Sequence, residues 1–199
     1  MTERSDKPEQ RSQREKIVRA TAQLLRQRGY AATGLSDIIE TSGAPKGSLY
    51  HYFPGGKDDI VVEALRYAGE KVQATLSDLA RQEKTAAGAL RRYAVLVAGW
   101  MAESKFRDGC PIATTLLETA AEKSKTAEAG RSAFESWTGV LSEKLVQEGV
   151  ARSRAETLAR LAIMSLEGTL IFARVEADAT PVISAMDEVA AMMEREAVR

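Results

Sequence analysis

The sequence predicts an all-helical protein, and three observations support this prediction. Apolar residues recur every three or four positions in nearly every periodic segment. No alternating run of β-branched residues is long enough to form a strand. Glycine and proline stand between the periodic segments, where helices end or begin. The 199 residues, 44% hydrophobic and 28% charged, are enough for one or two compact domains.

The N-terminal third predicts three helices. Apolar residues at helical spacing line one face of the first helix, and Gly29 ends it. The second helix covers residues 35–42 and stops at the glycine that follows. The third, residues 46–53, has about two turns because it lies between Pro45 and Pro54.

Six further helices are expected in the rest of the chain. The first of them begins near Asp58 and keeps its apolar face as far as Leu79, so it connects the N-terminal segment to the remainder. The others cover about residues 86–104, 111–121, 126–148, 153–174 and 181–196. The segments 107–110 and 121–127 are predicted surface loops. We expect two domains, residues 1–57 and 58–199, with a flexible tail at about residues 1–12.

The composition excludes several classes of protein. One Cys forms no internal disulfide, and together with one His it cannot complete a structural zinc site, so we expect neither metal nor cofactor. Residues 1–14 lack the apolar core of a signal peptide. The most apolar long stretch, residues 158–175, carries Arg160, Glu167 and Arg174, which makes it a poor membrane span. A cytoplasmic protein without membrane contact is therefore expected.

Charge is distributed unevenly along the chain. Residues 1–57 contain ten Lys and Arg against six Asp and Glu, whereas residues 58–199 contain 18 against 22. Within the basic part, two short helices separated by Gly43 and Ala44 have the layout of a helix-turn-helix. The second of these helices is polar on one side, as a helix that enters the major groove of DNA must be.

The same residues resemble the DNA-binding head of the TetR family of bacterial repressors. The resemblance rests on GYAAT at residues 29–33, DII at 37–39, SGAPKGSLYHYF at 42–53 and the lysine at 57. It extends over about residues 14–66. The linker PGGK at 54–57 and the later GCP at 109–111 resemble the LmrA and YxaF-like branch. Gly34 and Ser36 depart from the family pattern, since an N-cap hydroxyl and a longer basic side chain are common there.

This resemblance implies a set of residues that contact DNA. Gly47 allows a close approach of the backbone, and Lys57 at a helix start suits a phosphate. The implied set is Thr33, Ser36, Pro45, Lys46, Gly47, Ser48, Tyr50, His51 and Lys57. For His51 the alternative is a solvent-facing side chain without a role. Tyr52 and Phe53 are expected in the core. The basic residues of the first helix are interpreted as a solvated face, of which Arg11 and Arg14 could add phosphate contacts.

The body contains bulky apolar side chains with occasional polar groups, typical of a ligand pocket and equally of a helical core. The candidates are Trp100, Met101, Phe106, Cys110, Thr114, Leu117, Phe134, Trp137, Met164 and Glu167. A buried Glu167 needs a partner, which could be Arg160, Arg174 or a cationic group of a ligand. Cys110 is either a thiol of lowered pKa at a helix start or a small capping hydrophobe.

The helix at 153–174 is apolar on more than one face, so it must be covered on two sides. We expect it to form a four-helix dimer interface with the last helix, and the alternative is a core within one subunit. The expected interface residues are Leu158, Leu161, Leu166, Leu170, Val182, Met186, Val189 and Met193.

The leading functional hypothesis is a homodimeric, ligand-responsive transcriptional repressor. It would bind a palindromic operator, and a small apolar effector would shift the helix that begins near Asp58 and release the DNA. One alternative is a regulator without a small effector, which responds to a protein or to oxidation of Cys110. An enzyme is disfavoured, since the only His lies in the helix expected to read DNA.

Overall fold

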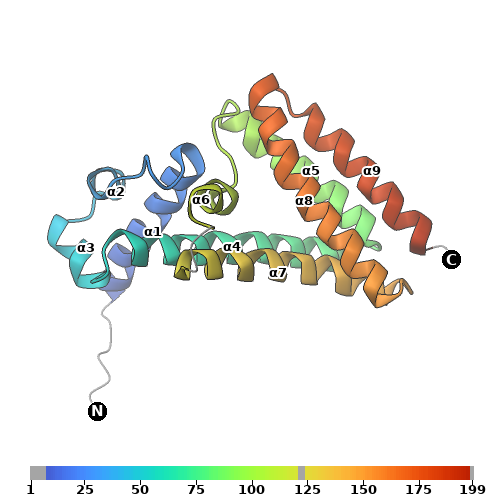
Figure 1. Ribbon diagram of the computed structural model, residues 1–199, viewed down its shortest axis with the longest axis horizontal. Coiled ribbons are helices and arrows are strands. Elements are labelled where there is room, and N and C mark those ends of the chain that lie inside the picture. Colours follow the sequence, from blue (N-terminus) through green and yellow to red (C-terminus); the bar gives the residue numbers. More distant parts are fainter. Residues whose placement is uncertain (1–7, 121–123, 198–199) are drawn as a thin grey trace, which may run out of the picture.

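The protein is all-helical, as the sequence predicts, in a computed structural model that describes residues 8–120 and 124–197, with side chains from Gln13 onward (Figure 1). Within these residues it has nine helices and no strand. The helices are α1 (Pro8–Arg28), α2 (Leu35–Ser42), α3 (Lys46–Tyr52), α4 (Lys57–Gln82), α5 (Ala86–Glu103), α6 (Pro111–Thr119), α7 (Lys125–Gln147), α8 (Arg152–Glu176) and α9 (Thr180–Ala197).

Helices α1 to α3 share a small core at one end of the molecule. Its buried side chains include Ile17 of α1, Ile38 of α2 and Leu49 of α3. Gly43 ends α2 at φ 63°, where a side chain would be strained. Gly34 is the N-cap of α2 and brings no side chain, but the carboxylate of Asp37 accepts the N–H of Gly34 at 2.9 Å. This reciprocal bond replaces the missing hydroxyl cap.

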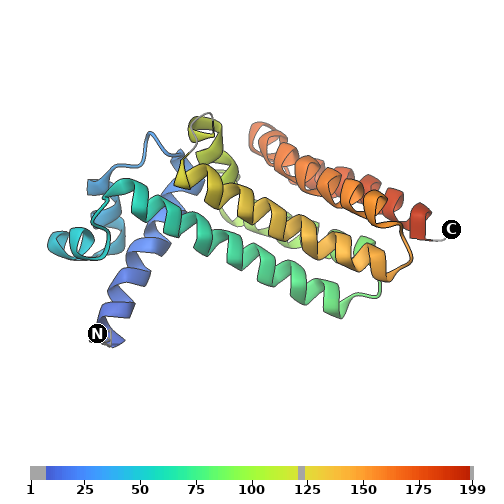
Figure 2. The same cartoon turned by 60° about the horizontal axis from the view of Figure 1, so that its bottom comes forward.

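Helix α4 extends from this head along the length of the body, with α7 at its side (Figures 1 and 2). The two helices approach closely at Gly69, where an added Cβ would lie 2.9 Å from the Cβ of Ala133. At the same point the indole N–H of Trp137 donates to the carbonyl of Gly69 at 2.9 Å. A glycine and an alanine therefore let the two backbones pack closely enough for a tryptophan to bond across them.

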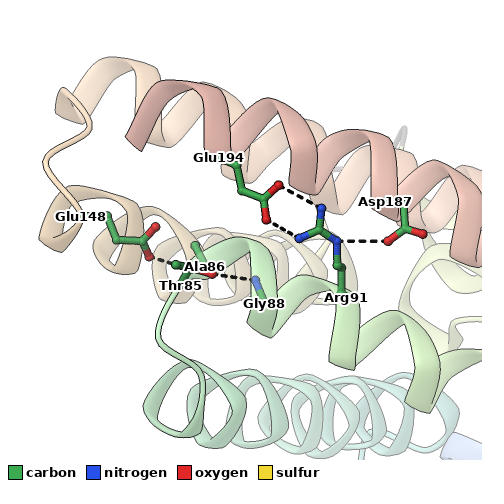
Figure 3. A network of polar contacts seen from close by, with 7 residues as sticks. All are labelled: Thr85, Ala86, Gly88, Arg91, Glu148, Asp187 and Glu194. Carbon is green, nitrogen blue, oxygen red and sulfur yellow. Dashed lines mark hydrogen bonds and ion pairs between the residues drawn. The ribbon is translucent and has the colours of Figure 1, made fainter. Parts of the chain in front are cut away.

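Helices α5, α8 and α9 form the far end of the body (Figure 1). Polar contacts fix their positions (Figure 3). The guanidinium of Arg91 on α5 donates to Asp187 at 3.2 Å and to Glu194, both on α9. The N–H of Ala86 donates to Glu148 at 2.6 Å, which joins the start of α5 to the end of α7. Apolar packing supplies most of the stability, and these contacts set the register of the helices.

The boundaries differ from the predicted ones at a few ends. The predicted tail at 1–12 is corrected for residues 8–12, which belong to α1, because a proline such as Pro8 suits a first helical turn. Residues 1–7 lie outside the described part of the chain, as do residues 121–123 in the second predicted loop. None of the described helices combines the length and the apolarity needed to cross a membrane.

Candidate DNA interface and ligand cavity

Helix α3 buries one side and exposes the other. Leu49 and the adjoining Phe53 are buried in the head core, Tyr52 is half-buried against it, and this confirms the expected core role of both aromatics. Five of the predicted DNA contacts lie exposed on α3 or at its start, and Ser48 is half-buried between the two sides. The exposed ones are Pro45, Lys46, Gly47, Tyr50 and His51. Ser36 of α2 is exposed as well.

Two of the predicted DNA contacts are engaged within the chain. Thr33 is completely buried, and its hydroxyl donates to the carbonyl of Gly29 at 2.7 Å, so the expected phosphate contact of this side chain is wrong. Its short side chain closes the turn between α1 and α2 instead. The ammonium of Lys57 donates to the carbonyl of Tyr30 at 2.7 Å and lies 4.0 Å from the centre of that ring. Lys57 thereby fastens the start of α4 to the end of α1.

The arginines of α1 are only partly a solvated face. Arg14 pairs with Glu63 of α4 at 2.7 Å and lies over the ring of Phe53, so it supports the packing of the head. Arg19 pairs with Glu15, and Lys16 is exposed. The side chain of Arg11 lies outside the described residues.

The body contains a partly open cavity of about 400 Å³ between α4, α5, α7 and α8. Arg26 of α1, the segment before α6 and the start of α6 complete its walls. This volume is within the range of pockets that bind small organic molecules. Five of the ten predicted ligand residues line it, namely Trp100, Met101, Cys110, Trp137 and Glu167.

The other five predicted ligand residues lie elsewhere, which corrects their assignment. Phe106 and Phe134 pack against the main core beside the cavity. The hydroxyl of Thr114 donates to the carbonyl of Leu25. Leu117 and Met164 are 83% and 59% exposed, because they lie on the outer faces of α6 and α8. An apolar helical residue can face core, cavity or solvent, and its spacing alone does not distinguish the three.

Several cavity residues were not predicted. Tyr67, Lys71 and Thr75 of α4 line the cavity, as do Tyr93 and Val97 of α5. The sequence contained a signal for the three residues of α4. They are four positions apart, so they lie on one face of the helix and place an aromatic and two polar side chains side by side. Asp108 and Gly109 contribute from the loop before α6.

Burial shifts the pKa of three cavity groups, Tyr93, Cys110 and Glu167, and Glu167 is the one among them that is charged when deprotonated near neutral pH. Burial raises its pKa to about 7, and a hydrogen bond from the Cys110 thiol acts in the opposite direction. Among the described residues no Lys or Arg lies within ion-pair distance of Glu167, so the expected partners Arg160 and Arg174 are not its partners. Its Oε2 atom is shielded from solvent and accepts no hydrogen bond from the described residues.

Cys110 caps the start of α6, where its Sγ accepts the N–H of Ala113 at 3.5 Å. Burial, followed by the nearby Glu167, raises the pKa of the thiol well above its ordinary value. A thiol of raised pKa forms little thiolate and reacts slowly with oxidants. The interpretation of Cys110 as a small capping hydrophobe therefore describes it better than that of an activated thiol.

Helix α6 and the loop before it are hydrogen-bonded to the end of α1. The N–H of Gly109 donates to the carbonyl of Arg26 at 3.0 Å. The carboxylate of Glu118 on α6 accepts the N–H groups of Tyr30 and Ala31 at 2.8 and 2.7 Å. In the same loop Lys105 and Phe106 have φ of 54° and 58°, a left-handed conformation that strains residues with a side chain. The loop that contributes Asp108 and Gly109 to the cavity is thus attached directly to the head.

The residues expected at a dimer interface form a core within the single chain, which corrects that prediction. All of them except Leu161 are buried in the core of the single chain, because α8 packs on α7 and α9, and α9 packs on α5. Exposed apolar side chains remain at several places, among them Val95 of α5 and Phe172 of α8, and one row of apolar residues follows the outer side of α8. We name it the α8 stripe, and it consists of Leu161, Met164, Gly168, Ile171 and Val175.

Two known protein families match this chain, one over the head and one over the body. Residues 17–64 match the family described as bacterial regulatory proteins of the tetR family. Residues 86–188, about half of the chain, match the C-terminal domain described as transcriptional regulator LmrA/YxaF-like. The families and relatives found are transcriptional regulators, not enzymes.

Individual relatives match over most of their length. The HTH-type regulator Rv0196 of Mycobacterium tuberculosis is 37% identical over 176 residues, which cover 84% of this chain and 87% of the relative. LmrA of Bacillus subtilis is 31% identical and the match covers 85% and 90% of the two chains. The crystal structure of a regulatory protein TetR from Rhodobacter sphaeroides has the same fold, with a TM-score of 0.79 at 23% identity over 89% of this chain and 96% of that one.

Proposed function

The chain belongs to the TetR family of DNA-binding transcriptional regulators, with an LmrA/YxaF-like C-terminal domain, and from this premise we propose that it is a homodimeric repressor released by a small ligand. Residues 1–57 would bind an operator, and residues 58–199 would bind the ligand and the second subunit. Two apolar cores support this division, although α1 and α4 each contribute to both, and Leu25 of α1, for example, is buried in the core of the body.

The proposed DNA surface is the exposed side of α3 with Ser36 of α2. Lys46 offers an ammonium, Tyr50 a hydroxyl and His51 an imidazole, and all three are exposed. Such groups bond phosphates and base edges in the major groove. Lys57 stays in the proposed surface as a phosphate contact, since its ammonium has two further N–H donors beside the bond to Tyr30.

The proposed dimer interface is the α8 stripe. Its members alternate at spacings of three and four residues, and Ile171 and Val175 are 59% and 81% exposed. An apolar stripe of this period packs against the same stripe of a second copy about a two-fold axis. Homodimers are typical of the family. Two heads related by such an axis would enter successive major grooves, about 34 Å apart, of a palindromic operator.

The observation that carries the proposed ligand response is the attachment of the cavity wall to the head. Gly109 lines the cavity and bonds to Arg26 of α1, and Glu118 on α6 holds the backbone of Tyr30 and Ala31. A ligand that displaces this loop would move the end of α1 and with it the DNA-binding surface. The sequence suggested α4 as the moving element, and α4 also lines the cavity through Tyr67 and Lys71. Both routes couple the two sites.

The test is operator binding, measured by fluorescence anisotropy of a labelled duplex over a salt series. The duplex comes from the DNA upstream of the protein's own gene or, failing that, from selection out of random duplexes. Lys46→Ala is expected to lower the affinity of the dimer at least about tenfold and to reduce the salt slope by about two, because each of the two subunits loses one phosphate contact. Lys84→Ala, an exposed lysine in the loop after α4, is the matched control and should bind as the wild type does.

Three results would contradict the proposal. Selection that enriches no sequence would contradict sequence-specific DNA binding. Equal effects of Lys46→Ala and Lys84→Ala would exclude α3 as the DNA surface. A selected operator without two-fold symmetry would contradict binding as a symmetric dimer.

A further inference from the structure

Two carboxylate oxygens in the cavity have no hydrogen-bond partner among the described residues. They are Oε2 of Glu167 and Oδ1 of Asp108, and both are shielded from solvent. Buried polar atoms of folded proteins are almost always hydrogen-bonded, and a buried carboxylate without a donor is costly. Two acceptors left open in one cavity therefore indicate that its occupant brings hydrogen-bond donors.

Arg26 and Lys71 line the cavity, and neither bonds to these two oxygen atoms. Arg26 approaches Asp108 through the other oxygen, Oδ2, at 3.6 Å. The ammonium of Lys71 lies 5.6 Å from the centre of the Tyr67 ring, and Lys71 is exposed. The Nη1 atom of Arg174 lies near Gly109, 3.2 Å from the position of an added Cβ. Asp108 thus has a cationic neighbour in Arg26, whereas Glu167 has no ion-pair partner among the described residues.

The remaining walls are aromatic. Tyr93 and Trp100 make an edge-to-face contact at 6.2 Å, and Trp137 lines the cavity from α7. Aromatic rings accommodate an apolar body, and their faces also attract a positive charge. A neutral hydroxyl has one donor to offer, whereas a primary ammonium has three and carries the charge that a carboxylate requires.

We propose that the cavity binds an organic ammonium ion with an apolar body, whose N–H groups bond to Glu167 and Asp108 and whose body packs against Trp100 and Trp137. The inference rests on the proposed function in taking this cavity as the ligand site of the regulator. It adds the chemical class of the ligand.

The test compares three probes with one apolar body, namely 4-phenylbutylamine, 4-phenylbutanol and 4-phenylbutanoate. Binding to the full-length protein is followed by quenching of tryptophan fluorescence. The chain has two tryptophans, and both line the cavity, so the signal reports its occupancy directly. The amine is expected to bind at least about tenfold more tightly than the alcohol, and the carboxylate more weakly than both.

Two variants locate the source of this preference. Glu167→Gln keeps the shape of the side chain and removes its charge, so the preference for the amine over the alcohol should fall to about twofold or less. Glu176→Gln on the same helix is the matched control, because Glu176 is exposed and does not line the cavity, and it should keep the full preference. Circular dichroism of both variants checks that the helices are intact.

Two results would overturn the inference. The first is equal or weaker binding of the amine relative to the alcohol, or no binding of the amine at millimolar concentration. The second is an unchanged preference in Glu167→Gln. Operator binding in the presence of each probe separates this inference from the proposed function. If the amine binds as expected and the operator affinity does not change, the ligand class is supported and the ligand response fails. If the alcohol releases the operator as well as the amine does, the response stands and the ammonium inference fails.

Discussion

Glu167 places a carboxyl group in a cavity where no described cation neutralises it. Its pKa rises from the ordinary 4.5 to about 7, which is the opposite of the shift in a paired carboxylate. As the pH rises from 4.5 to about 7, the unfolded chain releases the proton of this carboxyl group, whereas the folded chain retains it. The free energy of unfolding therefore falls between these two pKa values and stays lower above them.

We expect Glu167→Gln to be more stable than the wild type at neutral and alkaline pH. The gain should be at most about 3 kcal/mol, which is the free energy of the pKa difference, and it should disappear below about pH 4, where the wild-type carboxyl is protonated in both states. Urea unfolding of both proteins at about pH 4 and pH 8 measures the gain. A gain that is the same at both pH values would show that burial of charge is not its cause.

Other single residues show how far their type determines their role. Tyr50 and His51 were predicted at the surface of α3 and lie there. Thr33 is also polar and was also predicted to contact DNA, but it is buried. The difference arises from a local bond, since the Thr33 hydroxyl returns to the carbonyl of Gly29.

At the scale of elements, the contact between α4 and α7 depends on the absence of a side chain at Gly69. A Cβ there would lie 2.9 Å from that of Ala133, so the two helices would have to move apart. The same movement would stretch the bond from Trp137 to the Gly69 carbonyl. Trp137 also lines the cavity, which makes this contact relevant to ligand binding as well as to stability.

Gly69→Ala is expected to lower the free energy of unfolding by about 1–2 kcal/mol, since overpacking outweighs the gain in helix propensity. Gly139→Ala in α7 is the matched control. It has no heavy atom within 4 Å of the added Cβ, so it should raise the stability by up to about 1 kcal/mol. Thermal and urea unfolding measure the change in the free energy of unfolding for both variants. A Gly69→Ala variant that is more stable than the wild type would contradict the tight packing of α4 on α7.

At the scale of the whole molecule, the α8 stripe leaves apolar side chains exposed on one chain. We expect Ile171→Glu to give a monomer, because a charge in the middle of the proposed interface is costly to bury. Operator affinity should fall at least tenfold, since one head then binds alone. Sedimentation velocity measures the mass of the assembly.

Leu117→Glu is the control for this prediction. Leu117 is 83% exposed on α6, outside the α8 stripe, so the variant should have the same oligomeric state as the wild type. A dimeric Ile171→Glu, or a monomeric wild type, would contradict the proposed interface.

The sequence by itself determined the helices and their order, because helical periodicity, glycine stops and proline starts are local properties. It also determined which side of α3 is exposed, since a two-turn helix has few residues to bury. The tertiary structure decided what each apolar face contacts. The residues expected between two subunits, such as Leu158 and Met186, pack within one chain, because α7 and α9 cover α8 and α5 covers α9. The cavity, its two carboxyl groups and the bonds from α6 to α1 join segments far apart in the sequence, and no local pattern encodes such contacts.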